Sequence, residues 1–285
     1  MLLALALQLL ATAPPTARPR VPVVPLGPIY DGRRGATHVA LPRLSEEARV
    51  DGELDEPQWS QAAVLTGFSM YQPVDGRPAP DSTDVLVWYS STALYVGIRA
   101  YETHAPVHAT LADRDKISGD DNVLLFLDTF NDRRRAYVFG VNPLGIQADG
   151  MRSEGSGAGL ASGGAPGQND LSPDFAYESK GRLTAFGYQV ELRIPFASLR
   201  YPVAERVAFG LNVQRTVQHS GYVETWTAAH LASASFLSES GLLEGISGLH
   251  RGAVFEVNPE ATARATGAPA ATAAVSFVMS PLRIA

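Results

Sequence analysis

Residues 120–150, DDNVLLFLDTFNDRRRAYVFGVNPLGIQADG, decide the fold class of this chain. The run 123–130 is almost continuously apolar, as in a strand that is buried on both faces. An Asn-Asp pair at 131–132 ends that run, because both side chains bond their own backbone and tolerate positive φ. Residues 136–141 then alternate between two faces, and proline and glycine at 142–145 make the next turn. The stretch predicts two strands and the start of a third, in a meander whose apolar face needs a second sheet to cover it.

The rest of the chain repeats this pattern of short strands separated by turns. Its clearest hairpin joins 83–89 to 94–101, where residues of the two faces alternate along both strands. Further strands are predicted at 37–44, 67–72, 174–179, 187–194, 206–215 and 222–227, and short helical turns near 54–63 and at 195–199. About ten short strands, few helices and no alternation of strands with long helices predict a mainly β protein, an antiparallel β-sandwich with short helical turns.

The composition narrows the possible function classes. The chain has 285 residues, a net charge of −6 and no cysteine. A negative net charge offers no basic surface to nucleic acid, so no nucleic-acid partner is predicted. The lack of cysteine excludes disulfide bonds, thiolate zinc sites and a cysteine nucleophile.

The N-terminus has the features of an exported protein. Residues 2–11, LLALALQLLA, are apolar, and Ala-Thr-Ala at 11–13 resembles a cleavage site. We therefore expect a signal peptide over 1–17 and export to the periplasm, the outer membrane or the cell surface, the alternative being a mis-assigned start. Residues 18–44 are rich in proline and arginine and predict an extended linker.

Three segments resemble one protein family. They are LDTFNDRRRAYVFGVNPLGIQADG (127–150), VDGELDEPQWSQA (50–62) and GYQVELRIPFASLRY (187–201). All three are similar to bacterial proteins that carry a carbohydrate-binding family 9-like domain, a DOMON-like β-sandwich, in front of an outer-membrane-type β-barrel. The resemblance implies such a sandwich over 45–230, which we expect to fold alone, and a remnant of the barrel or a disordered tail over 231–285.

The resemblance also implies a function, which is non-catalytic binding of a polysaccharide or oligosaccharide. Related domains are often attached to glycoside hydrolases, so it further implies a link to carbohydrate catabolism and to hydrolysis of O-glycosyl compounds. The alternative is a structural periplasmic domain of an outer-membrane barrel protein with no sugar site. A structure that shows whether the aromatic side chains are exposed would discriminate between the two functions.

Candidate sugar-binding residues lie where the acidic loop 113–122 is expected to meet later strands. A sugar ring packs its C–H face on an aromatic side chain, and its hydroxyls bond planar polar groups. The candidates are Trp226, Phe175 and Tyr177 for the ring, and Arg114, Asp121, Asn122 and Gln214 for the hydroxyls. In the resembled family an aromatic residue often stands where this chain has Asn122. Trp59 and Trp88 are expected in the core.

The same acidic loop is a candidate calcium site. Calcium takes six to eight oxygen ligands, and the loop offers the carboxylates of Asp113, Asp115, Asp120 and Asp121. The resemblance to family 9 modules, which carry structural calcium, implies the same ion here. The alternative is an acidic loop that binds no ion and is only solvated. No cofactor is required for the predicted function, and calcium is the candidate ion.

No catalytic residue is predicted. A glycosidase needs two carboxylates across a cleft, and Asp128, Asp149, Glu178 and Glu191 lie on predicted strands, but nothing in the sequence selects a pair. His104 and His108 are interpreted as exposed loop histidines. Residues 153–169 are rich in glycine, alanine and serine and predict a mobile, dispensable loop.

Overall fold

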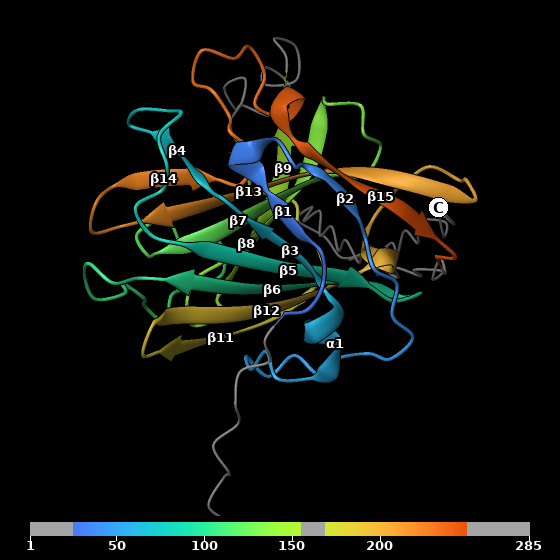
Figure 1. Ribbon diagram of the computed structural model, residues 1–285, viewed down its shortest axis with the longest axis horizontal. Coiled ribbons are helices and arrows are strands. Elements are labelled where there is room, and N and C mark those ends of the chain that lie inside the picture. Colours follow the sequence, from blue (N-terminus) through green and yellow to red (C-terminus); the bar gives the residue numbers. More distant parts are fainter. Residues whose placement is uncertain (1–24, 155–168, 250–285) are drawn as a thin grey trace, which may run out of the picture.

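The computed structural model describes residues 25–154 and 169–249, and these residues form two sheets packed face to face (Figure 1). The first sheet has the order β1 (Ile29–Asp31), β3 (Ala63–Thr66), β5 (Thr83–Tyr89), β6 (Ala93–Tyr101), β12 (Gly187–Pro195) and β11 (Glu178–Thr184). The second has the order β10 (Asn169–Asp170), β9 (Gln147–Ser153), β8 (Arg135–Val141), β7 (Asn122–Asp128), β13 (Arg206–Val217), β14 (Tyr222–Thr225) and β4 (Ser69–Gln72). The prediction of a mainly β sandwich is confirmed.

Two more strands extend the second sheet beside β13. The first half of this long strand pairs with β15 (Gly241–Ser247), which also pairs with β2 (His38–Ala40), and its second half pairs with β14. The pairs β1–β3 and β2–β15 are parallel, so both sheets are mixed rather than purely antiparallel. The helical segments among the described residues are α1 (Pro57–Gln61) and the 3-10 turns η1 (Gly32–Arg34), η2 (Phe196–Ser198) and η3 (Leu237–Glu239).

The meander predicted from residues 120–150 forms as expected. β7 pairs antiparallel with β8, and β8 with β9, over nearly their whole lengths. Asn131 has a φ of 51° in the first turn and Gly145 a φ of 83° in the second, which are the left-handed conformations that these residue types tolerate. Alternate residues of β7 face opposite sides, and Leu125 and Phe126 are both buried, in two different clusters. This strand is therefore covered on both faces, as its apolar run predicts.

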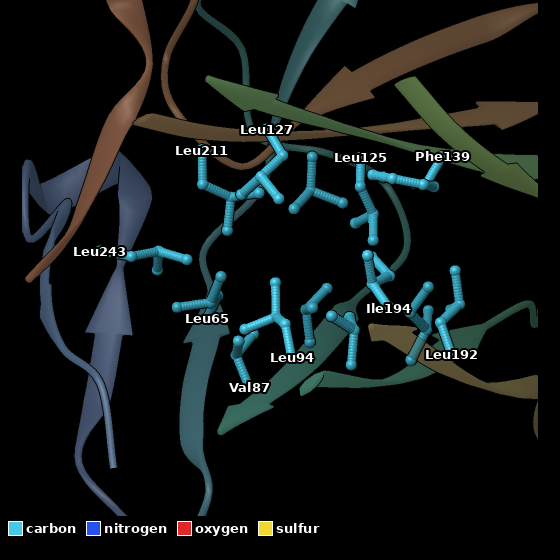
Figure 2. Packing of buried hydrophobic residues seen from close by; sticks show 14 of the residues in the cluster. Leu65, Val87, Leu94, Leu125, Leu127, Phe139, Leu192, Ile194, Leu211 and Leu243 are labelled. Atoms are coloured by element: carbon cyan, nitrogen blue, oxygen red, sulfur yellow. The ribbon is translucent and has the colours of Figure 1, made fainter. Parts of the chain in front are cut away.

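The main core lies between the two sheets. Figure 2 shows Val87, Leu94 and Ile194 of the first sheet facing Leu125 and Leu127 of the second. These positions alternate along their strands with residues that point to the outer faces, which is the period of two expected for a sandwich. The burial of this cluster is the main stabilising contribution to the fold.

Each sheet also has an apolar cluster on its outer face. Over the first sheet, α1 places Trp59 edge-on against Trp88, with ring centroids 5.9 Å apart, and Trp88 stacks on Tyr95. The prediction that Trp59 and Trp88 belong to the core is confirmed. Over the second sheet, Phe236 packs on Phe126 at 5.0 Å. The helix α1 begins with Pro57 at its first position, and its N-cap residue is Glu56.

The domain boundaries predicted at residues 45 and 230 do not match the ends of the sheets. Residues 29–31, expected in an extended linker, supply β1, and residues 38–40, within the strand predicted at 37–44, supply β2. Residues 241–247, expected in a barrel remnant or tail, supply β15. Residues 1–24, 155–168 and 250–285 lie outside the described part of the chain, and with them the predicted signal peptide and most of the predicted mobile loop and tail. No helix within 25–154 and 169–249 is long and apolar enough to cross a membrane.

Candidate functional site

The acidic loop lies beside Phe175 and Tyr177, as predicted, and the side chain of Arg114 occupies the space between them. The Arg114 Nε donates to Asp149 Oδ1 at 2.8 Å, and Nη2 donates to the Phe175 carbonyl at 2.9 Å. Its guanidinium also lies 5.7 Å from the centre of the Tyr177 ring, and Nη1 donates to the side chain of Gln147. The predicted hydroxyl-binding arginine therefore uses its donors within the protein.

The three aromatic candidates are not open platforms. Trp226 has no exposed surface, and its indole Nε1 donates to the Tyr30 carbonyl at 3.2 Å. Tyr177 is buried, and its hydroxyl donates to the Gly140 carbonyl at 2.7 Å; burial raises the pKa of this hydroxyl well above its usual range. The prediction of Trp226 and Tyr177 as stacking residues is wrong, because a buried ring cannot meet a sugar. Phe175 is half-buried against Tyr137 and keeps part of its ring exposed.

The remaining polar candidates hold loops together. Asp121 accepts the backbone N–H of His108 and that of Gln218, each at 2.7 Å. Asn122 donates to the Asp120 carbonyl at 2.9 Å. Gln214 is half-buried in β13, where it pairs with β7 and β14. Asp121 and Asn122 are buried, so these two side chains tie the acidic loop to the strand ends.

The four carboxylates predicted to bind calcium do not come together. Asp120 accepts from Thr110 and Asn142, and Asp115 accepts the backbone N–H of Asp149. Asp113 is exposed and pairs with Lys116. Within the described residues, the two groups of three potential metal ligands lie elsewhere, at Asp81, Glu102 and His104 and at Asp51, Glu56 and Glu191. The residues of this loop therefore do not fit a calcium ion.

The carboxylates considered for glycosidase chemistry have structural contacts. Asp128 accepts the backbone N–H of Arg133 at 2.7 Å, and Asp149 is buried beneath Arg114. Glu178 is exposed and pairs with Arg193 at 2.9 Å. None of these contacts places two carboxylates across an open cleft, which glycoside hydrolysis needs.

Glu191 anchors the segment that carries the opening motif VDGELDEPQW. Its Oε2 accepts the backbone N–H groups of Asp51 and Gly52 at 2.8 and 2.6 Å, and its Oε1 accepts the Trp59 indole N–H at 3.1 Å. Burial raises the pKa of Glu191 to about 8, although the Gly52 and Asp51 donors oppose this. The cluster of Asp51, Glu56 and Glu191 thus fastens α1 over the first sheet.

A polar hollow opens at the end of the sandwich where β6 and β13 finish and β5 and β14 begin. We call it the Asp81 pocket. It consists of two adjoining hollows of about 450 and 280 Å³, which share Pro80 and Asp81. The other lining residues are Ser82, Asp84, Tyr101 and Thr103 in the first hollow, and His104, Val217, His219, Ser220, Tyr222 and Glu224 in the second. Its residues come from three separate parts of the chain, 80–84, 101–104 and 217–224, because antiparallel strands bring alternate turns to the same end.

A buried arginine lies beneath this pocket. Arg215, with 1% of its surface exposed, follows Leu211 and Val213 on the inner face of β13. Its Nη1 donates to Thr83 Oγ1 at 3.0 Å and its Nη2 to the Tyr101 carbonyl at 2.8 Å. Nη2 also lies 3.4 Å from Glu102 Oε2. Arg215 therefore connects β13 of the second sheet to β5 and β6 of the first.

Asp81 and His104 form an ion pair at the mouth of the pocket. The His104 Nδ1 lies 2.9 Å from Asp81 Oδ2, and the imidazole is 59% exposed whereas the Asp81 side chain is 6% exposed. Burial acts to raise the pKa of Asp81, but hydrogen bonds from His104 and Thr103 outweigh it and lower this pKa. The hydrogen bond to Asp81 raises the pKa of His104 in turn.

Glu224 contributes a carboxylate whose Oε2 has no hydrogen-bond partner. Its residue is 1% exposed and lines the pocket together with Asp81 and His104. Burial raises the pKa of Glu224 to about 7; Arg215 opposes this rise, and the negative charges of Asp81 and Glu102 add to it. A buried polar atom without a partner is uncommon in folded proteins and points to an interaction with something outside the chain.

The sequence signal for this pocket is an arginine at an inward position of a strand. Arg215 stands in phase with Val213 and Val217, where a valine or leucine is expected. From the sequence, His104 is interpreted as an exposed loop histidine, and Asp81, Glu102, Arg215 and Glu224 are not brought together with it. The contact between them depends on strand pairing, which proximity along the sequence does not reveal.

No protein-family model matches the chain, and no curated protein matches it. Three solved structures resemble it in fold. A family 9 carbohydrate-binding module from Caldicellulosiruptor kristjanssonii in complex with cellotriose is 18% identical, covers 77% of this chain and 99% of its own, and has a TM-score of 0.48. A family 9 carbohydrate-binding module from the same organism in complex with glucose is 17% identical, covers 78% of this chain and 100% of its own, and has a TM-score of 0.49. A candidate carbohydrate-binding protein from Bacteroides uniformis is 14% identical, covers 73% of this chain and 98% of its own, and has a TM-score of 0.49.

Proposed function

We propose that this chain is a non-catalytic carbohydrate-binding protein and that saccharides bind in the Asp81 pocket. The observation that carries the proposal is the composition of the pocket, which presents carboxylates, imidazoles and hydroxyls beside two half-exposed tyrosines, Tyr101 and Tyr222. Asp81, Asp84 and His104 can bond sugar hydroxyls, and a tyrosine ring can take the C–H face of a pyranose. The resemblance of residues 50–62, 127–150 and 187–201 to family 9-like domains supports the same function.

The size and openness of the pocket favour a weak, reversible complex. Its two hollows, of about 450 and 280 Å³, are near the lower end of the range for small-molecule sites. Two half-exposed tyrosines, Tyr101 and Tyr222, are available for stacking, and one aromatic contact contributes on the order of 1 kcal/mol beyond its burial. We therefore expect dissociation constants roughly between micromolar and millimolar.

The test is titration calorimetry of the full chain against a panel of soluble plant and bacterial glycans. At least one glycan should give saturable heat at millimolar concentration. Tyr222→Ala should weaken its binding about fivefold or more, as expected for loss of one stacking contact. The matched control is Phe130→Ala. This change removes an exposed aromatic from the turn after β7, at the end of the sandwich opposite the Asp81 pocket, and should leave the affinity unchanged.

Phe175 distinguishes this pocket from the site predicted at the acidic loop. If Phe175→Ala weakens binding and Tyr222→Ala does not, the saccharide binds beside Arg114 instead. If the folded chain shows no heat with any glycan, carbohydrate binding is excluded for that panel. The second candidate function, a structural domain of an outer-membrane protein with no sugar site, would then hold. The burial of all three tryptophans, Trp59, Trp88 and Trp226, is the observation that favours this second candidate.

The cellular context is part of the proposal. We propose that the chain is exported and acts in the cell envelope, in association with the outer membrane and in support of carbohydrate catabolism. The support is the apolar stretch 2–11 and the segments shared with family 9-like domains. Any hydrolysis of O-glycosyl compounds then belongs to enzymes that act beside it. Fractionation of cells that express the full chain, with N-terminal sequencing of the product, tests this context; an uncleaved chain in the cytoplasm would contradict it.

A further inference from the structure

Three potential metal ligands meet at the Asp81 pocket. Asp81, Glu102 and His104 each offer one ligand atom, and these atoms all lie within 4.8 Å of one another. Both carboxylates are buried, which fixes their positions. Glu102 Oε1 accepts the backbone N–H groups of His104 and Ala105, at 3.1 and 3.3 Å, so the loop after β6 folds around this carboxylate. The three side chains are thus held in place by the end of β6 and the loops beside it.

Glu224 is a second and independent indication of a bound cation. This residue comes from β14, in the other sheet, and lines the same hollow as Asp81 and His104. Its buried Oε2 accepts no hydrogen bond. Burial of a carboxylate oxygen without a donor is costly, and a cation in the pocket would remove that cost.

The charges around the pocket also favour a cation. Asp81, Glu102 and Glu224 provide three buried carboxylates, and the buried guanidinium of Arg215 contacts one of them, Glu102. Arg215 is only partly available to Glu102, at 3.4 Å, because its shorter bonds go to Thr83 and to the Tyr101 carbonyl. His219 is also near, with Nδ1 3.7 Å from Glu102 Oε2.

We propose that Asp81, Glu102 and His104, with Glu224 beside them, bind a divalent first-row transition metal ion such as Zn²⁺. An imidazole together with carboxylates is a ligand set typical of zinc and its neighbours, whereas calcium prefers oxygen ligands alone. His104 would turn from its hydrogen bond with Asp81 to coordinate the ion through a ring nitrogen. Because His104 is largely exposed, the ion would remain open to a ligand from solvent. This site goes beyond the proposed sugar binding and does not depend on it.

The test uses the full chain after treatment with a chelator. Titration with Co²⁺ should produce visible d–d absorption bands that saturate at about one equivalent, and Zn²⁺ should abolish them by competition. His104→Ala and Asp81→Asn should each weaken Co²⁺ binding roughly tenfold or more. The matched control is His230→Ala, because His230 is an equally exposed histidine that lies 2.9 Å from a single carboxylate, Glu239, outside both clusters.

Two results would overturn the proposal. One is the absence of saturable Co²⁺ binding in a chain whose circular dichroism shows that it is folded. The other is binding that His104→Ala and Asp81→Asn leave at the affinity of the unaltered chain. The absorption bands report the metal alone and the calorimetry reports the saccharide, so either function can fail while the other stands.

Discussion

Glu191 shows how one buried carboxylate can organise a segment distant in sequence. It receives three N–H donors from residues 51–59, and this segment carries the helix that covers the outer face of the first sheet. The sequence VDGELDEPQW therefore has a structural reason for its acidic and glycine residues. Gly52, for example, has a φ of 87° where its N–H meets the carboxylate.

Glu191→Gln should remove a pH dependence from the stability of the protein. Burial raises the pKa of Glu191 to about 8, whereas an unfolded glutamate titrates near about 4.3. The folded state keeps a proton that the unfolded state loses, so stability is full below the unfolded pKa and falls as the pH rises towards the folded pKa. Between about pH 5 and about pH 8, the free energy of unfolding should fall by roughly 4 kcal/mol. Urea unfolding between about pH 5 and about pH 8 measures it.

Glu178→Gln is the matched control for this experiment. Glu178 lies on the neighbouring strand β11, directly opposite Arg193, and it is exposed. Its substitution should leave the slope of stability against pH as it is in the unaltered protein. The assignment to Glu191 is refuted if the slope persists in Glu191→Gln.

Single residues also show where sequence reasoning about the site succeeded and failed. It placed Arg114 beside Phe175 and Tyr177, and these residues do meet. It treated Trp226 as a platform, because the sequence does not show that Gly241 and Tyr30 close over the indole. It grouped Asp113 and Asp115 with Asp120 by their proximity in sequence, whereas each carboxylate is satisfied by a different partner.

At the scale of elements, long strands with residues of both faces buried could be predicted over nearly their full length, whereas the short strand β1 could not be predicted. β5, β6, β7 and β8 each have at least seven residues, so their alternation is visible in the sequence. β1 has three residues, which is too short for a period to be recognised, whereas β2 lies within the strand predicted at 37–44. Both strands pair in parallel with partners remote in sequence. Their positions are set by the sheet edges that they complete.

Gly241→Ala should destabilise the edge formed by β15. A Cβ at Gly241 would lie 2.6 Å from Cζ3 of Trp226 and 2.7 Å from the Thr37 carbonyl oxygen. Neither the indole nor the strand can move without losing contacts, so we expect an overpacking cost of about 1–3 kcal/mol. Thermal unfolding of the variant measures the change.

Gly119→Ala is the control for added volume at a glycine. No atom lies within 4 Å of a Cβ built there, and Gly119 is not among the glycines with positive φ. Its melting temperature should match that of the unaltered chain. Equal melting temperatures for Gly241→Ala and Gly119→Ala would show that β15 is not tightly packed on Trp226.

At the scale of the whole molecule, the two sheets extend beyond residues 45–230, the segment expected from the sequence to fold alone. We expect residues 25–249 to give one sharp thermal transition. The fragment 45–230 should melt at a lower temperature or without cooperativity, because it lacks β1, β2 and β15 and with them Val39, Leu243 and Ile246 of the main core. Circular dichroism of the two fragments makes the comparison. Equal melting curves would restore the boundaries at 45 and 230.

The pairing of β2 with β15 has a consequence for the order in which the protein assembles. His38 and Glu244 contact each other across 206 positions of sequence. Contacts between such distant residues slow folding, because the intervening chain must be ordered first. During synthesis, residues 38–40 emerge early but have no partner strand until residue 244 has also emerged. β2 is therefore synthesised early but joins its sheet late. Until β15 is available, the backbone hydrogen-bonding groups of β2 are open to any other strand that reaches them.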